Sequence, residues 1–124
     1  MNRRARRGTV AAVLPVLALV SLLTACGGDD GGGSTEPITI EVTVDGGTVT
    51  PSGDRVEVDV DQPVDIVVTA DEPGELHVHS SPETTREFTA GENAPIGLRF
   101  DRPGIVEVEL HEPFEGPVVE LEIS

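Results

Sequence analysis

The sequence predicts an all-β domain of about seven or eight short strands, arranged as a sandwich or a barrel, over residues 38–124. Two observations support this fold class. Apolar and polar residues alternate along several short segments, as they do in strands that bury one face. Turn-forming Gly, Pro and Asp residues separate these segments at short intervals, and no window keeps the 3.6-residue period of an amphipathic helix.

The first half of the domain gives the clearest strands. Residues 38–44 (ITIEVTV) alternate cleanly, and the Asp-Gly-Gly turn at 45–47 leads into a short strand at 48–50. Residues 55–60 (RVEVDV) alternate again after a Pro-Ser-Gly break. After a turn that contains Pro63, residues 64–70 (VDIVVTA) form a more continuously apolar strand.

The second half begins with a histidine-containing strand at 74–80 (GELHVHS), which follows an Asp-Glu-Pro turn. Residues 81–86 are polar and are predicted to form a loop. The remaining predicted strands are a short one at 87–90, then 95–100, 105–111 and 118–123.

The composition determines what the core can contain. The chain has three phenylalanines and no Trp or Tyr, so the core must be built from Val, Ile and Leu. The same scarcity of wide aromatic surface argues against a site that stacks sugars or bases. The predicted core residues are Ile40, Val42, Val58, Val60, Ile66, Val68, Leu76, Val78, Phe88, Leu98, Phe100, Val106, Val108, Leu110, Val119, Leu121 and Ile123.

The N-terminus predicts export. Residues 1–25 combine a basic start with an apolar run of about 14 residues that contains Pro15, too short to span a bilayer as a permanent helix. The run ends in Leu-Thr-Ala-Cys, which resembles the lipobox of bacterial lipoproteins; the alternative is an ordinary signal peptide with an accidental cysteine. The resemblance implies cleavage after residue 25 and lipid attachment at Cys26. Residues 26–37, rich in Gly, Asp and Ser, are then a flexible linker, and the protein is anchored by lipid on the extracytoplasmic face of the cell membrane.

The charge of the predicted mature chain excludes several partners. All 23 acidic residues follow Cys26, whereas only four arginines do, which gives residues 26–124 a net charge of −19. Nucleic acid is excluded as a partner because the chain offers no cluster of basic side chains that could contact phosphates. With Cys26 acylated no thiol remains, so disulfides and thiolate metal sites are excluded as well.

The three histidines are the candidate site. In a strand at 74–80, His77 and His79 share one face and lie two residues apart. His111 ends a later strand. Together with His77 and His79, and with Glu75, Glu109 and Glu112 nearby, it would suit Cu(II) or Zn(II). The alternative is structural: solvent-facing histidines that form ion pairs with the many neighbouring acids.

Three segments of the domain resemble the cupredoxin-like domains of secreted bacterial proteins, including those attached to periplasmic iron-uptake proteins. They are ELHVH after a Pro-Gly turn, AGE, and FDRPGIVEVE, at residues 75–79, 90–92 and 100–109. The resemblance implies a cupredoxin-like Greek-key β-sandwich over 38–124. It places His77 where the first copper histidine of cupredoxins stands, but Leu110, Pro113 and Val118 at or near the positions of the cysteine, second histidine and methionine. A blue-copper centre needs the thiolate, so this chain is expected to lack one.

The sequence therefore favours a binding protein over an enzyme. It contains no Gly-x-Ser-x-Gly motif and no glycine-rich phosphate loop. It also contains no nucleophile, histidine and acid in the order of a catalytic triad. The leading hypothesis is a membrane-anchored lipoprotein with a non-catalytic cupredoxin-like binding or accessory domain, whose protein partner the sequence does not identify. The alternative is a copper(II)- or zinc-binding protein of the cell envelope that uses the three histidines.

Overall fold

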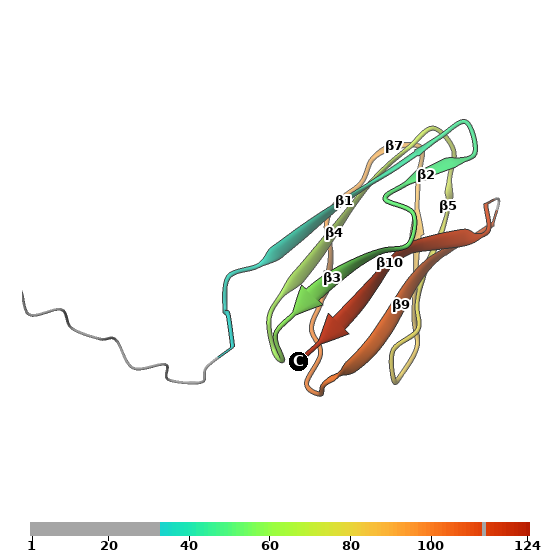
Figure 1. Cartoon of the computed structure of the whole chain (residues 1–124). Coiled ribbons are helices and arrows are strands. Elements are labelled where there is room, and N and C mark those ends of the chain that lie inside the picture. Colours follow the sequence, from blue (N-terminus) through green and yellow to red (C-terminus); the bar gives the residue numbers. More distant parts are fainter. Residues whose placement is uncertain (1–32, 113) are drawn as a thin grey trace, which may run out of the picture. The chain divides into compact units, whose positions relative to one another are not determined.

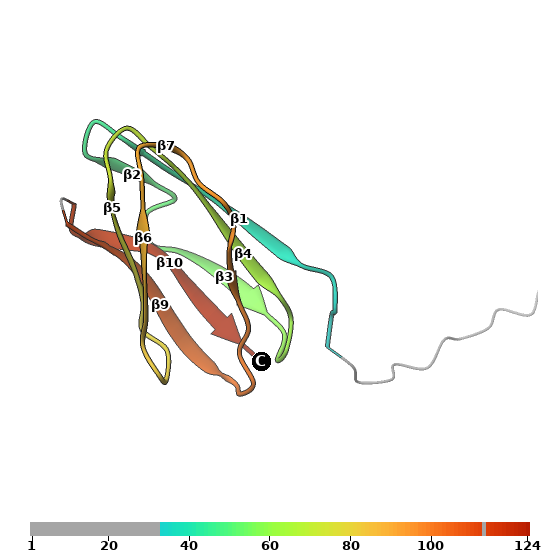
Figure 2. The same ribbon diagram turned by 180° about the vertical axis from the view of Figure 1, so that it is seen from behind.

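A computed structural model describes residues 33–112 and 114–124 of the chain. Cys26, the signal segment, most of the predicted linker and Pro113 lie outside the described residues. Within them, ten strands form two five-stranded sheets that pack face to face, which confirms the predicted all-β sandwich (Figures 1 and 2). The described residues include no helix long and apolar enough to cross a membrane.

The first sheet is built on the pairing of β1 (Ile38–Asp45) with β4 (Val64–Ala70). These two strands run parallel, and β2 (Thr48–Thr50) adds to the far edge of β1 through the tight turn at 45–48. Two short antiparallel strands, β7 (Gly91–Glu92) and β8 (Ile96–Leu98), pair with β4. The sheet covers the apolar core on one side.

The second sheet has the strand order β3-β10-β9-β5-β6. Its strands are β3 (Asp54–Val58), β10 (Gly116–Ile123), β9 (Gly104–His111), β5 (Gly74–Val78) and β6 (Thr84–Phe88). All neighbours are antiparallel except β3 and β10. The histidine-bearing strand β5 therefore lies between β9 and β6, where side chains from three strands can meet.

The core forms where the inward faces of the two sheets meet. Alternation along the longer strands β1, β4, β5, β9 and most of β10 buries every second residue, and the described residues include one buried apolar cluster of eighteen. Leu76 and Val78 of β5 are fully buried, as are Val108 and, within 1 %, Leu110 of β9. Each such side chain contributes roughly 1.5–3 kcal/mol by leaving water.

The buried core differs from the predicted list in two ways: some buried residues were not predicted, and some predicted residues are not fully buried. Val44, Val64, Ala70 and Val118 are buried although they were not predicted, and Val60, Leu98 and Phe100 are only half-buried. Val118 has a local cause, because the pairing of β10 with β9 shifts register between Pro117 and Val119. That irregularity turns two consecutive residues inward, which a strict period of two cannot predict.

The prediction of a loop at 81–86 is wrong for its second half. Thr84 to Phe88 form β6, which pairs along the whole of β5. This strand lies at the edge of its sheet and buries only Phe88, so its sequence is polar and lacks a clean alternation. The predicted histidine strand is also shorter than expected, since β5 ends at Val78. His79 nevertheless stays beside β9, because its N–H donates a hydrogen bond to the carbonyl of Glu107 at 2.9 Å.

The described end of the predicted linker contacts the domain. The side-chain amide of Gln62 is buried and donates a 2.8 Å hydrogen bond to the carbonyl of Glu36. The N–H of Ser34 donates to the carboxylate of Asp59 at 2.6 Å. These bonds hold residues 34–36 against the turn that follows β3.

Candidate functional site

The three histidines lie together on the outward face of the second sheet. Because Leu76 and Val78 point into the core, His77 points outward, and His79 continues the same side beyond the end of β5. The pairing of β5 with β9 sets His77 opposite Glu109 and Glu75 opposite His111. The structure thus brings together all three residues that the sequence singled out, here called the histidine cluster.

The ring nitrogens of the histidine cluster converge. One nitrogen from each ring can be chosen so that all three lie within 4.8 Å of one another. His77 Nδ1 lies 3.4 Å from His111 Nε2, and the His77 ring centroid lies 4.3 Å from that of His79. Donors to one tetrahedral ion with bonds of 2.0–2.1 Å are about 3.3 Å apart. The 4.8 Å limit exceeds this spacing by about 1.5 Å, so the rings would have to rotate to place all three nitrogens around one ion.

Two carboxylates contact the histidine cluster from different sides. Glu109 Oε2 lies 2.9 Å from His79 Nε2, which donates a hydrogen bond to it, and 3.4 Å from His111 Nε2. Glu83 lies 3.5 Å from His77 Nε2 and 3.9 Å from His79 Nδ1. Sequence reasoning placed Glu109 near the histidines but missed Glu83, which it assigned to a loop. The sequence feature that could have identified Glu83 is its position four residues after His79, in the connection between β5 and β6.

The contact between His79 and Glu109 shifts the pKa values of both side chains. The hydrogen bond to Glu109 raises the pKa of His79 above its usual 6.5, against a smaller opposing effect of desolvation, and the charges of Glu109, Glu83 and Glu107 add to the rise. The same hydrogen bond lowers the pKa of Glu109 below its usual 4.5. Glu109 is therefore ionised at neutral pH, and an incoming cation meets a carboxylate rather than a carboxylic acid.

The histidine cluster is open enough for an ion to enter and buried enough to be ordered. The side chain of His77 is 19 % exposed, that of His79 33 % and that of His111 41 %. Glu109 is also 33 % exposed, whereas the side chain of Glu83 is 66 % exposed. The four inner groups are thus half-buried, and Glu83 beside them is more exposed.

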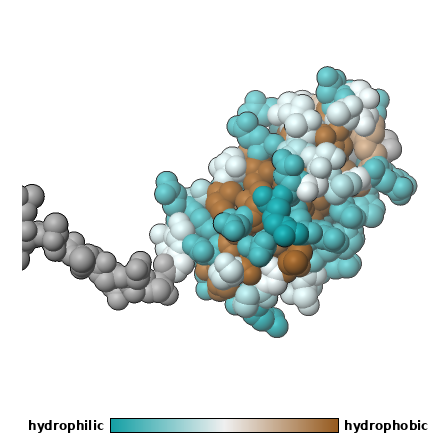
Figure 3. All heavy atoms as spheres, viewed as in Figure 1, coloured by the Kyte–Doolittle hydropathy of each residue, from teal (hydrophilic) through white to brown (hydrophobic). Residues whose placement is uncertain are grey.

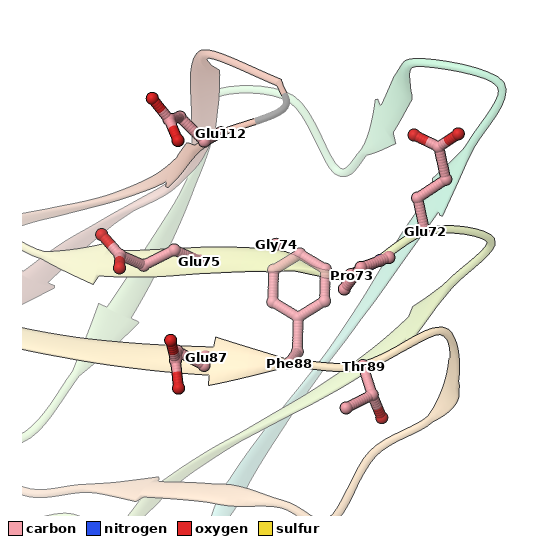
Figure 4. Close-up of a pocket in the computed structure, with 8 residues that line it drawn as sticks. All are labelled: Glu72, Pro73, Gly74, Glu75, Glu87, Phe88, Thr89 and Glu112. Carbon is pink, nitrogen blue, oxygen red and sulfur yellow. The ribbon is translucent and has the colours of Figure 1, made fainter.

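A depression lined by four glutamates is drawn in Figure 4. It lies next to the histidine cluster along the sheet, because its residue Glu75 is paired with His111. Its residues are Glu72, Pro73, Gly74, Glu75, Glu87, Phe88, Thr89 and Glu112. In Figure 4 the Phe88 ring stands beside Gly74, and Glu75 and Glu87 extend from the paired strands β5 and β6. The face seen in Figure 3 carries hydrophilic side chains with apolar patches between them. The four glutamates of the depression raise the local concentration of cations.

Comparison with known proteins supports the fold. No family model matches the chain, and no curated protein matches it either. Among solved structures, the chain is similar to a multicopper oxidase, with a TM-score of 0.53 and 20 % identity over 72 % of this chain and 44 % of that one. It is also similar to auracyanin from Roseiflexus castenholzii, with a TM-score of 0.50 and 11 % identity over 75 % of this chain and 99 % of that one. A purple cupredoxin from Nitrosopumilus maritimus gives 0.50 and 14 %, over 70 % and 99 %.

These likenesses confirm that the β-sandwich is cupredoxin-like. The chain spans less than half of the multicopper oxidase, but nearly the whole of auracyanin and of the purple cupredoxin. At identities of 20 % and below, the similarity concerns the fold alone, and the site has to be argued from its own residues.

Proposed function

We propose that this domain is a non-catalytic metal-binding module. It holds one divalent ion, preferably Cu(II), between His77, His79 and His111. The observation that carries the proposal is the convergence of three imidazole nitrogens within 4.8 Å on a rigid sheet. Imidazole suits both copper and zinc. Copper is named first because the solved structures with this fold include a multicopper oxidase, whose name specifies copper.

The residues of this domain do not fit a blue-copper centre. That centre requires a cysteine thiolate and usually an axial methionine. The sequence has one cysteine, Cys26, and one methionine, Met1, and neither belongs to the domain. Leu110, which the family resemblance places at the cysteine position, points into the core with 1 % of its surface exposed. The proposed module therefore binds its ion through nitrogen and oxygen and carries out no blue-copper electron transfer.

The proposal also places the module at the cell surface. The sequence Leu-Thr-Ala-Cys at 23–26 supports a lipoprotein with a signal peptide at 1–25, a lipid on Cys26, a linker at 26–37 and the domain at 38–124. A lipid-anchored domain on the extracytoplasmic face would meet metal ions before they cross the membrane. An accessory role, in which the module supplies or buffers an ion for an envelope protein, follows from that position.

Calorimetric titration of the full-length Cys26→Ser chain with Cu(II) tests the proposal, since the substitution removes the only thiol. We expect one ion per chain at neutral pH and no intense blue colour. His77→Ala should abolish this uptake, whereas Glu120→Gln, which removes a charge elsewhere on the same sheet, should not. Competition with Zn(II) establishes which ion the site prefers.

The competing structural interpretation predicts a different result. If the histidines serve only as partners of Glu109 and Glu83, no stoichiometric uptake occurs, and weak cation binding persists when all three are replaced. Either of these two outcomes refutes the proposed function.

A further inference from the structure

We propose that Glu109 is the fourth ligand of the ion and that Glu83 holds two of the three rings in place from behind, an inference that rests on the proposed metal binding. The site would then have three nitrogen donors and one oxygen donor. Such a set favours a divalent ion over Cu(I), which prefers thiolate and thioether ligands.

The position of Glu109 follows from the backbone. Strand pairing sets Glu109 directly opposite His77, and alternation along β9 puts it on the same face as His111, two residues later. Its Oε2 atom contacts Nε2 of both His79 and His111, at 2.9 and 3.4 Å. The same His111 nitrogen lies 3.4 Å from His77 Nδ1. Four donor atoms from two neighbouring segments, residues 77–79 and 109–111, therefore form one connected group.

The contacts that link these four atoms can be compared with the spacing of donors around one ion. With bonds near 2.0–2.1 Å, donors lie about 3.3 Å apart in a tetrahedral site, and neighbouring donors lie about 2.9 Å apart in the square-planar site that Cu(II) prefers with nitrogen and oxygen ligands. Two of the three contacts are 3.4 Å, and the third, 2.9 Å between His79 and Glu109, is the length of a hydrogen bond. An ion would displace the proton that this hydrogen bond shares and push the two atoms slightly apart. Glu109 needs no change of strand position or face to become a ligand.

The role of Glu83 follows from which nitrogens it approaches. It lies beside Nε2 of His77 and Nδ1 of His79, the ring nitrogens that face away from the group described above. Metal-binding histidines commonly donate their second N–H to a carboxylate, which fixes the tautomer and the orientation of the ring. At 3.5 and 3.9 Å, the exposed side chain of Glu83 is within a small rotation of both rings. Glu83 is thus a positioning residue for two ligands at once.

Charge-matched variants separate these roles from the general acidity of the surface. Glu107 is on the same strand and face as Glu109, and its charge influences His79, but among the described residues its carboxylate makes no hydrogen bond to a histidine ring. Glu109→Gln and Glu107→Gln remove the same charge. Glu109→Asp keeps the charge but withdraws the oxygen by one methylene. Both side chains point out of the core, so the three variants should fold, and circular dichroism verifies this.

The experiment is a Cu(II) titration of the full-length Cys26→Ser chain with each variant, followed by electron paramagnetic resonance. We expect Glu109→Gln to lower affinity by more than about 100-fold and Glu83→Gln by about tenfold. Glu107→Gln should cost less than about fivefold. Only the Glu109 variants should change the copper hyperfine pattern, because only they alter the donor set, and Glu109→Asp should weaken binding at least tenfold.

The outcomes distinguish this inference from the function on which it rests. If the parent chain takes up one Cu(II), but Glu109→Gln behaves like Glu107→Gln or Glu109→Asp binds as the parent does, Glu109 is not a ligand and the histidines suffice. If Glu83→Gln has no effect, its positioning role is wrong. If the parent chain takes up no copper, the proposed function fails, and this inference fails with it.

Discussion

Gly74 should be intolerant of any side chain, because it lies where β5 passes beneath the ring of Phe88. A Cβ atom at this position would lie 2.6 Å from Phe88 Cζ and 2.9 Å from the carbonyl oxygen of Glu112. Both separations are below van der Waals contact, and the ring is buried, with 4 % of its surface exposed. Gly74→Ala should therefore cost about 1–3 kcal/mol of stability, the range for overpacked cores. For a domain of this size that corresponds to a melting temperature lowered by about 5–20 °C.

Thermal unfolding followed by circular dichroism measures this loss. Gly116→Ala is the matched control, because an added Cβ there meets nothing within 4 Å; it should change stability by less than about 0.5 kcal/mol. Phe88→Leu removes the ring atom that clashes, so Gly74→Ala should cost roughly 1 kcal/mol less in that background. The carbonyl of Glu112 remains, and the relief should be partial. If Gly74→Ala were as harmless as the control, the close packing of β5 against Phe88 would be refuted.

Three further predictions concern anchoring, salt and acidity. Cys26→Ser should release the protein from the membrane fraction or block its processing, and fractionation that finds a mature-sized variant still in the membrane would contradict the lipid anchor. Because the predicted mature chain carries a net charge of −19, its melting temperature should rise with moderate salt, and indifference to ionic strength would mean that the acids are already paired or well separated. The hydrogen bond between His79 and Glu109 should stabilise the metal-free fold most between about pH 4.5 and 6.5, the usual pKa values of the two groups. Above this window the raised pKa of His79 is passed and its contribution is lost; below it, the lowered pKa of Glu109 is passed and the carboxylate is neutralised. A double-mutant cycle of His79→Gln and Glu109→Gln, measured by urea unfolding, should show coupling at pH 5.5 that weakens as the pH rises through the raised pKa of His79, and coupling independent of pH would contradict the ion pair.

Alternation along single strands carried most of what the sequence could predict. The outward direction of His77 follows from the apolar residues on either side of it, Leu76 and Val78, and the structure agrees. The meeting of His111 with His77 depended instead on β9 pairing with β5, which only the resemblance to cupredoxin-like domains indicated. The alternation of apolar and polar residues along a strand predicts which face of the sheet a residue lies on. It does not predict which strand pairs with that strand.

The errors arose where the local pattern was weak. Strand β6 is an edge strand with one buried residue, Phe88, so its sequence resembles a loop. Glu83, at the turn before β6, was missed for that reason. Val118 was missed because the irregular pairing at Pro117 turns two successive residues inward. In each case a neighbouring strand determines the position, and a single sequence does not show its neighbours.

The most direct test of the metal site is a crystal structure of the Cu(II)-loaded protein with anomalous diffraction measured at the copper edge. We predict one strong anomalous peak on the outward face of the second sheet. It should lie about 2.0–2.2 Å from one ring nitrogen each of His77, His79 and His111 and from a carboxylate oxygen of Glu109. Copper found only in the acidic depression around Glu75 and Glu87, or no ordered peak at all, would contradict the account.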